Sequence, residues 1–223
     1  MQEDSILLID KPANMTSFGV VARVRRQLSQ QLGKKAKVGH TGTLDPFATG
    51  LMIIVTGKKC REAGNYSKLD KVYEAIIRLG QTSTTGDPEG DLTDISDAMP
   101  TSEQVQAALN RFVGVITQRP PVYSAIKING QRAYKLARKG VEVEVPERQV
   151  TIYSLELLDY SYPEIRIRAH VGSGTYIRTL AEDIGKALGT GAYCSRLRRT
   201  KVGEWSVEDA RPVVDRPIAA VGE

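Results

Sequence analysis

The sequence predicts an α+β fold with a central mixed or antiparallel sheet flanked by helices. Strand-like and helix-like segments are mixed along the 223 residues without a regular βαβ repeat. Residues 141–160 and 164–171 read as consecutive antiparallel strands, and the second alternates apolar with polar side chains. No internal repeat or low-complexity linker marks a domain boundary. We therefore expect one domain, with residues 120–148 standing out from its core as an insertion.

The first elements follow from local signals. The apolar residues 6–9 predict a buried strand, which must close by Pro12 because proline cannot continue a ladder. Thr16 or Ser17 can cap a following helix, and Gly33 can end it. The apolar positions of this helix recur at the helical period: Val20, Val21, Val24, Leu28 and Leu32.

Further along the chain, residues 38–50 contain three glycines and an Asp-Pro pair, which predict a loop. Residues 51–55 predict a strand. Residues 71–79 predict another strand. Thr101 and Gln104 suit a capping box at the start of a helix. The last clear helix spans about 175–188 and presents one apolar face made of Ile177, Leu180, Ala181, Ile184 and Leu188.

The charges are distributed unevenly. Lys and Arg number 31 against 26 Asp and Glu, for a net charge of +5. Residues 11–44, 119–139 and 196–201 carry basic side chains and no acid, whereas residues 81–110 carry six acids and no base. A basic face is typical of proteins that bind a phosphate backbone. Charge alone is equally compatible with a solvated lysine-rich surface.

Several classes of protein and site are disfavoured. Cys60 and Cys194 form no CxxC pair, so the sequence contains neither a zinc-ribbon signature nor a disulfide framework. His40 and His170 are distant in sequence and make a weak case for a metal, so we expect no metal site. The apolar residues 6–9 are too few for a signal peptide or a membrane span, and a cytoplasmic protein is expected.

The loop at residues 38–50 contains one acid, Asp45, in an otherwise basic neighbourhood. Nearby Lys and Arg should lower the pKa of this carboxyl and keep it ionised, as a nucleophilic aspartate requires. A second interpretation is that Asp45 and Pro46 only initiate a turn. The segment lacks the GxxxxGK[ST] spacing of a phosphate-binding P-loop.

Other polar residues have simple structural explanations when each is taken alone. The alternating Asp87, Glu89 and Asp91 do not match a calcium loop, and a solvated turn is expected there. Tyr73 suits a strand by its β-propensity. Arg178 could form a helical pair with Glu182, four residues further on.

Six short motifs occur in a fixed order along the chain: LIDKP at 8–12, GHTGTLDPFATG at 39–50, KVY at 71–73, PVYSAIK at 121–127, GTYIRT at 174–179 and RLRR at 196–199. Together they resemble the motifs of the bacterial TruB family of tRNA pseudouridine synthases, over nearly the whole chain to about Val207. The resemblance implies a pseudouridine synthase fold and a catalytic domain over residues 1–207, followed here by a short tail at 208–223.

The resemblance implies isomerisation of uridine 55 in the T-loop of tRNA to pseudouridine, without metal or cofactor. Asp45 matches the catalytic aspartate, and Arg178 matches the arginine that pairs with it. Tyr73 matches the tyrosine that stacks on the flipped base and is a candidate for proton handling. Tyr176 and Leu197 match residues that shape the uracil pocket.

The resemblance also assigns residues that bind RNA. His40 matches the histidine that contacts the displaced nucleotides of the loop. Lys11 and the insertion at 120–148 would hold the RNA backbone and loop, in line with the preference of specific RNA recognition for single-stranded loops. The expected partner is the T-arm of tRNA, with no membrane and no obligatory protein partner, and the protein is expected to be a monomer.

One departure from the family pattern concerns the C-terminus. Family members commonly carry an RNA-binding PUA domain, and residues 208–223 are too few to form one. Two alternatives to the uridine-55 isomerase are kept. One is a guide-dependent pseudouridine synthase that acts on other RNAs, against which the short C-terminus counts. The other is a non-catalytic module that binds or folds tRNA, against which Asp45, Tyr73 and Arg178 argue.

Overall fold

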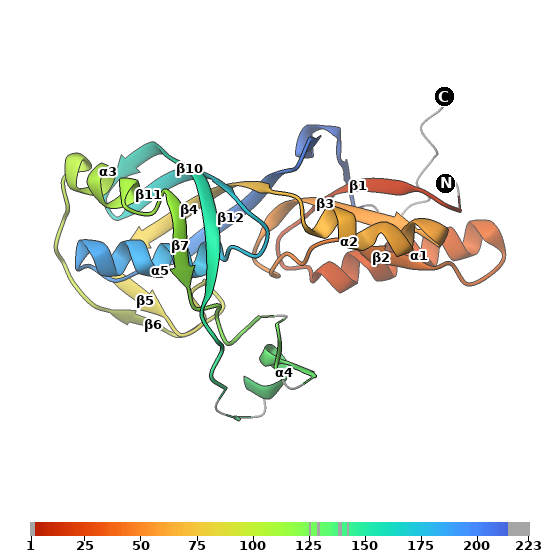
Figure 1. The fold of residues 1–223 in the computed structure, drawn as a ribbon, viewed down its shortest axis with the longest axis horizontal. Helices are drawn as coiled ribbons and strands as arrows, with labels where there is room; N and C mark the ends of the chain where they lie inside the picture. Colours follow the sequence, from red (N-terminus) through yellow and green to blue (C-terminus); the bar gives the residue numbers. More distant parts are fainter. Residues whose placement is uncertain (1–2, 125, 129, 138–139, 142, 214–223) are drawn as a thin grey trace. The chain divides into compact units, whose positions relative to one another are not determined.

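The computed structural model describes residues 3–124, 126–128, 130–137, 140–141 and 143–213. It divides into two compact units, and each is described by itself. Unit 1 comprises Met1–Val72 and Arg198–Glu223, and unit 2 comprises Tyr73–Leu197. The α+β class predicted from the sequence is confirmed, because both units combine helices with strands of a mixed sheet (Figure 1).

Unit 1 is built around β3 (Thr49–Thr56). This strand pairs antiparallel with β1 (Ile6–Lys11) and β2 (Val38–His40), and parallel with β12 (Ala192–Val202) through Arg198 and Arg199. Its residues from Gly50 to Thr56 are all buried, as expected for a strand covered on both faces. The remaining elements of unit 1 are η1 (Gly57–Glu62), α2 (Ala63–Ser67), β13 (Trp205–Ser206), η2 (Val207–Asp209) and β14 (Arg211–Pro212).

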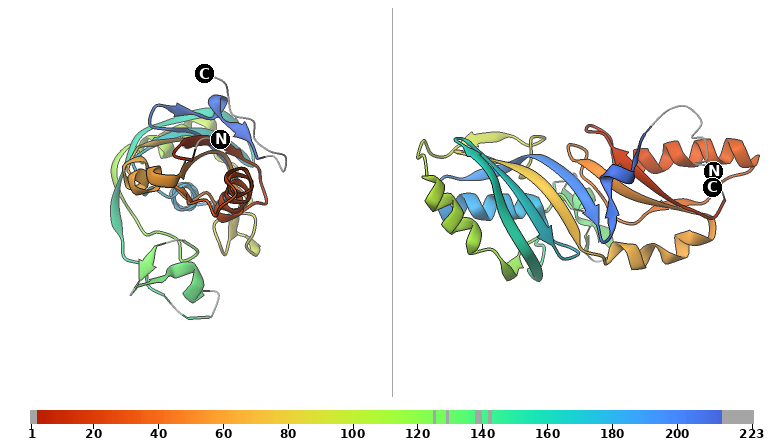
Figure 2. Two further views of the ribbon diagram at one scale, coloured as in Figure 1. Left: turned by 90° about the vertical axis from the view of Figure 1, so that its right-hand side faces the viewer. Right: turned by 90° about the horizontal axis from the view of Figure 1, so that it is seen from above.

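Helix α1 (Ser17–Leu32) runs beside the strands of unit 1 (Figure 2). Thr16 is its N-cap, and the Thr16 hydroxyl accepts a hydrogen bond from the Gly19 N–H at 2.9 Å. Gly33 ends the helix with a left-handed φ of 64°. Four of the five apolar positions predicted to face inward are buried, namely Val20, Val21, Val24 and Leu28.

In unit 2 the strand order is β12, β4 (Lys71–Leu79), β11 (Glu164–Val171), β10 (Arg148–Ser161) and β7 (Gly114–Gln118). Strands β4 and β12 contribute residues to both units. Helices α3 (Ser102–Asn110) and α5 (Ile177–Leu188) contact each other, and the Thr101–Gln104 capping box predicted for α3 is present. Strands β5 (Gln81–Ser83) and β6 (Leu92–Asp94) form a separate hairpin.

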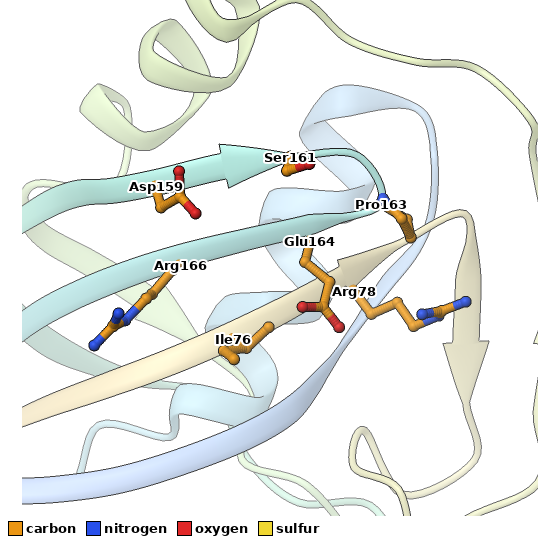
Figure 3. A pocket seen from close by; sticks show the side chains of 7 residues that line it. All are labelled: Ile76, Arg78, Asp159, Ser161, Pro163, Glu164 and Arg166. Atoms are coloured by element: carbon orange, nitrogen blue, oxygen red, sulfur yellow. The ribbon is translucent and has the colours of Figure 1, made fainter.

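The sheet of unit 2 also has a polar, exposed face. Glu74 on β4 binds Arg166 and Arg168 on β11, with N–O distances of 2.9 and 3.1 Å. Beside them lies a hollow of about 280 Å³, lined by side chains of β4, β10, β11 and the β10–β11 turn (Figure 3). None of the residues that line it is a site residue predicted from the sequence, so this hollow is not the candidate active site.

One predicted strand needs correction, and the structure adds elements that the sequence did not predict. The strand expected over 141–160 begins only at Arg148, and β2 and β12 were not predicted. The range 120–148 holds β8 (Lys127–Ile128), β9 (Gln131–Arg132) and α4 (Ala133–Ala137), and β8 and β9 pair only with each other in the sheet order. The predicted tail contributes β14 to the edge of β1, and its part from residue 214 onward lies outside the described residues.

No helix in the described part of the chain is both long enough and apolar enough to cross a bilayer.

Gly50 offers a test of how closely β3 and β12 approach. Its φ is 105°, and an added Cβ would lie 2.3 Å from the main-chain oxygen of Arg199. Gly33 also has a positive φ, but an added Cβ there meets no atom within 4 Å. We expect Gly50→Ala to lower the free energy of unfolding by about 3 kcal/mol or more, and Gly33→Ala by only about 1 kcal/mol. Urea unfolding measures both, and equal losses would contradict the close approach.

Candidate active site

The predicted nucleophile, Asp45, lies in unit 1 on the loop that joins β2 to β3. Its side chain is half-buried, and its carbonyl accepts a hydrogen bond from the Ala48 N–H at 3.2 Å. His40 is the last residue of β2 and pairs with Ile54 of β3. The loop of Asp45 is therefore anchored at one end by His40 in β2 and at the other by β3, whose residues from Gly50 to Thr56 are buried.

The loop is also held at its middle by a buried serine. The Ser17 hydroxyl, at the start of α1, donates to the Leu44 carbonyl and accepts from the Leu44 N–H, both at 2.8 Å. Ser17 is buried, so these bonds do not compete with water. Leu44 precedes Asp45 directly, and the start of α1 therefore fixes the backbone on which the predicted nucleophile is carried.

A buried arginine holds the same loop from β12. The Arg199 side chain donates to the carbonyls of Leu51 at 2.8 Å and Gly42 at 3.2 Å, and it also reaches the Thr43 carbonyl. Arg199 belongs to the basic tract at 196–201, for which a surface role was expected. Arg199 is instead buried, with 2% of its surface exposed. Successive side chains of β12 point to opposite faces of the sheet, and that of Arg199 points inward. Arg198 binds Asp10 at 2.8 Å, so it too has a partner within the protein.

Lys11 requires a correction. We expected it to hold the RNA backbone, but its side chain is completely buried. Its ammonium donates to the carbonyls of Pro12 at 2.9 Å, Met15 at 2.7 Å and Pro46 at 3.1 Å. Since Pro46 follows Asp45, Lys11 ties β1 and the segment before α1 to the loop of the predicted nucleophile. The physical reason is that a lysine at this strand end is buried, and its ammonium group must find oxygen acceptors inside the protein.

Lys71, the first residue of the KVY motif, is also structural. Its ammonium donates to the carbonyls of Ser67, at 2.8 Å, and Leu69. Burial, and secondarily the positive charge of Arg199, lowers the pKa of Lys71 to about 8. Lys71 and Arg199 therefore bring two positive charges into the interior of unit 1.

The remaining predicted site residues lie in unit 2. Tyr73 on β4 and Leu197 on β12, two neighbouring strands, are each 8% exposed. Tyr176 is the N-cap residue of α5, and Arg178 lies in the first turn of that helix. The predicted residues are thus divided between the units, with Lys11, His40 and Asp45 in unit 1 and Tyr73, Tyr176, Arg178 and Leu197 in unit 2.

Arg178 is buried at 3% exposure and is held by two segments of unit 2. It forms an ion pair with Asp87 at 3.1 Å, and it donates to the carbonyls of Thr85 and Tyr123, both at 2.7 Å. The helical pair with Glu182 that the sequence suggested is therefore not what holds this arginine. Three oxygen acceptors from two loops fix its guanidinium group.

Asp87 is a buried partner of the predicted site residue Arg178, and the sequence analysis missed it. We expected a solvated turn, but Asp87 is 3% exposed. Its carboxylate accepts from the Thr85 hydroxyl at 2.6 Å and from the Glu89 N–H at 3.0 Å, in addition to the ion pair with Arg178. In the sequence Asp87 looks the same as the exposed Glu89 and Asp91, so nothing local distinguished it. Its burial is set by its distant partner on α5.

The described residues contain no group of three or more His, Cys, Asp or Glu side chains suited to a metal ion. His170 lies beside the Tyr153 ring, with ring centroids 4.8 Å apart.

Comparisons with known proteins now bear on this arrangement. Residues 26–177 match the family described as "TruB family pseudouridylate synthase (N terminal domain)", and residues 178–214 match "tRNA pseudouridylate synthase B C-terminal domain". The chain belongs to the TruB family. The resemblance inferred from its motifs is confirmed.

Two curated relatives of this TruB-family protein are both named tRNA pseudouridine synthase B. The protein from Phocaeicola vulgatus is 46% identical over 97% of this chain and 93% of its own length. The protein from Dechloromonas aromatica is 47% identical over 91% of this chain, but the match covers only 66% of its own length. The chain therefore spans nearly all of one relative and about two thirds of the other.

Solved structures are similar as well. The structure titled "Crystal Structure of a Cbf5-Nop10-Gar1 Complex" aligns with a TM-score of 0.72 and 28% identity, covering 95% of this chain and 53% of the other. A structure titled "Crystal structure of pseudouridylate synthase" aligns with a TM-score of 0.51 at 15% identity, covering 98% of this chain and 72% of the other. The second similarity shows the fold alone, and it agrees with the pseudouridine synthase fold that the family implies.

The buried pair of Arg178 and Asp87 makes a prediction about stability. Asp87→Asn removes the carboxylate of this buried ion pair, so we expect a loss of about 3 kcal/mol in the free energy of unfolding. The matched control is Asp91→Asn, which changes an exposed acid of the same loop and should cost less than about 0.5 kcal/mol. Urea unfolding at pH 7 checks both, and similar losses in the two variants would contradict a structural role for the pair.

Glu182 makes a second prediction, about pH. Burial raises the pKa of its carboxyl, and an added Cβ at Gly86 would lie 2.4 Å from its Oε1 atom, so the 84–87 turn packs closely on it. The folded state thus binds the proton of the Glu182 carboxyl more tightly than the unfolded state does. The free energy of unfolding therefore falls as pH rises from the ordinary pKa of 4.5 through the raised pKa of the folded state. Glu182→Gln should remove this decrease in the free energy of unfolding, because glutamine does not titrate. Unfolding free energies from pH 4 to 8 test this, and parallel curves for the two proteins would contradict it.

Proposed function

We propose that this protein isomerises uridine 55 in the T-loop of tRNA to pseudouridine. The observation that carries the proposal is the loop of Asp45, an acid held between β2 and β3 by Ser17, Arg199 and Lys11 in a chain of the TruB family. Similarity over 97% of the chain to a relative named tRNA pseudouridine synthase B supports the choice of tRNA as the substrate.

In this proposal each predicted residue has a defined role. Asp45 is the nucleophile, and Arg178 is the arginine that pairs with the nucleophile in the family. Tyr73 stacks on the flipped base and handles a proton. Tyr176 and Leu197 shape the uracil pocket, and His40 contacts the displaced nucleotides of the loop. Lys11 now has a positioning role, because its buried ammonium group binds the loop of Asp45.

The reaction begins with extrusion of the target nucleotide, because no side chain can reach the glycosidic bond inside the stacked loop. Asp45 attacks the nucleotide, and the bond between N1 of uracil and C1′ of ribose breaks. The uracil turns, C5 forms the new bond to C1′, and the bond between Asp45 and the nucleotide breaks, so the carboxylate is regenerated. The proton on C5 is lost and N1 gains a proton, so the product is an isomer of the substrate.

We also propose the setting in which this enzyme works. Residues 1–207 supply the catalytic part, which includes both compact units. The protein acts in the cytoplasm as a monomer, without cofactor, metal, guide RNA or obligatory protein partner. The exposed basic residues of tracts 11–44 and 119–139 supply phosphate contacts, so tRNA binding should weaken as salt increases.

The central test uses Asp45→Asn with unmodified T-arm RNA. The wild-type protein should form pseudouridine, and the variant should form none detectable, because an amide cannot act as the nucleophile. Both proteins should bind the RNA with similar affinity. The matched control is Asp91→Asn, an exposed acid that should leave the rate unchanged. Pseudouridine is measured by a carbodiimide-based chemical assay on the RNA.

Three outcomes would contradict the proposal. Binding without pseudouridine in both wild type and variant would favour a non-catalytic tRNA module. Activity that appears only after a guide RNA is added would favour a guide-dependent synthase. Loss of wild-type activity on addition of a chelator would contradict the metal-free mechanism.

A further inference from the structure

Tyr176, proposed above as a wall of the uracil pocket, is held at its main chain by a buried glutamine. The Gln118 side-chain oxygen accepts from the Tyr176 N–H at 3.1 Å, and its amide nitrogen donates to the Tyr176 carbonyl at 3.3 Å. Gln118 ends β7 and is 1% exposed. Water therefore does not compete for either bond, and both polar groups of the Tyr176 backbone are fixed by one side chain.

The ring of Tyr176 is held by a second residue, Arg148, at the start of β10. The Arg148 guanidinium carbon lies 5.1 Å from the centre of the Tyr176 ring, within the range of a cation–π interaction. The same guanidinium group donates to the carbonyl of Gly174, two residues before Tyr176. Arg148 thus contacts both the ring and the turn that carries it.

The Gly174 turn fits closely around this arginine. Gly174 has a φ of 90°, and an added Cβ would lie 3.1 Å from a terminal nitrogen of Arg148. Within the described part of the chain, Arg148 forms no ion pair with a carboxylate. Among these residues, its partners include the Tyr176 ring and the Gly174 carbonyl.

We propose that Gln118 and Arg148 are positioning residues that hold Tyr176 in place for the isomerisation. This proposal rests on the proposed function. Gln118 fixes the backbone of Tyr176 and Arg148 fixes its ring, so the wall of the uracil pocket is in place before RNA binds. A pocket wall that is fixed in advance raises the rate of the chemical step, because a displacement of about 1 Å in a reacting site can cost about a hundredfold.

An alternative is that Arg148 binds an RNA phosphate directly. The two roles differ in what they change. A phosphate contact contributes to affinity and to its salt dependence, so its loss would weaken binding and flatten the salt slope. A positioning residue acts through Tyr176, so its loss should lower the rate at saturating RNA and should depend on whether Tyr176 is present.

The test is a double-mutant cycle with Arg148→Met, Tyr176→Leu and the double variant. Single-turnover rates at saturating T-arm RNA and the dissociation constant at two salt concentrations are measured for each. We expect Arg148→Met alone to lower the rate about tenfold, with the dissociation constant and its salt slope unchanged. In the Tyr176→Leu background the same change should lower the rate less than about twofold. An equal fall in both backgrounds, or weaker binding with a flatter salt slope, would overturn the proposal.

Two further variants complete the design. Arg166→Met removes an exposed arginine of β11 that pairs with Glu74, and it should leave the rate unchanged. Gln118→Glu keeps the side-chain size but loses the donor to the Tyr176 carbonyl, and it should lower the rate without changing affinity. If the wild type is active and both Arg148→Met and Gln118→Glu react at the wild-type rate, the positioning role of these two residues is overturned and the proposed function is not. An inactive wild type would instead contradict the proposed function.

Discussion

A guanidinium group that is removed from water must give its donors to oxygen atoms of the protein, and two arginines impose this requirement here. In unit 1, Arg199 donates to carbonyls of the loop that carries Asp45 and to β3. In unit 2, Arg178 draws together Asp87, the Thr85 carbonyl and the Tyr123 carbonyl. Each arginine therefore gathers segments that are distant in sequence. The candidate site is built on loops whose shapes depend on these two buried charges.

The same requirement changes the meaning of the basic composition. A net charge of +5 and three acid-free tracts indicated a surface for a phosphate backbone. The structure shows that the side chains of Lys11, Lys71 and Arg199 donate hydrogen bonds to main-chain carbonyls inside unit 1. Side chains such as Arg196 and Lys201 are exposed and available to a ligand. Basic residues in this protein thus serve two purposes, and only those on the surface can contribute to the salt-dependent part of RNA binding.

Much of the secondary structure could be predicted because its signals are local. The Thr16 cap and Gly33 define α1, the Thr101 capping box defines the start of α3, and the alternation of polar and apolar residues defines β11. Strand β12 was not predicted, because its Arg- and Lys-rich sequence resembles a surface loop. It becomes a strand because β3 and β4 lie on either side of it and satisfy its backbone, which no local pattern reports.

The candidate site likewise has features that the sequence predicts and features that only the tertiary structure reveals. The sequence by itself determined the family, and it predicted the loop around Asp45 and the candidate site residues Tyr73, Tyr176, Arg178 and Leu197, because these predictions depend on the order and chemistry of residues along the chain. Only the tertiary structure decided that Asp87 is buried with Arg178, that Lys11 is internal, and that Gln118 and Arg148 hold Tyr176. The physical reason is that burial and pairing are properties of distant segments brought together, so identical residue types in one stretch of sequence can have opposite environments.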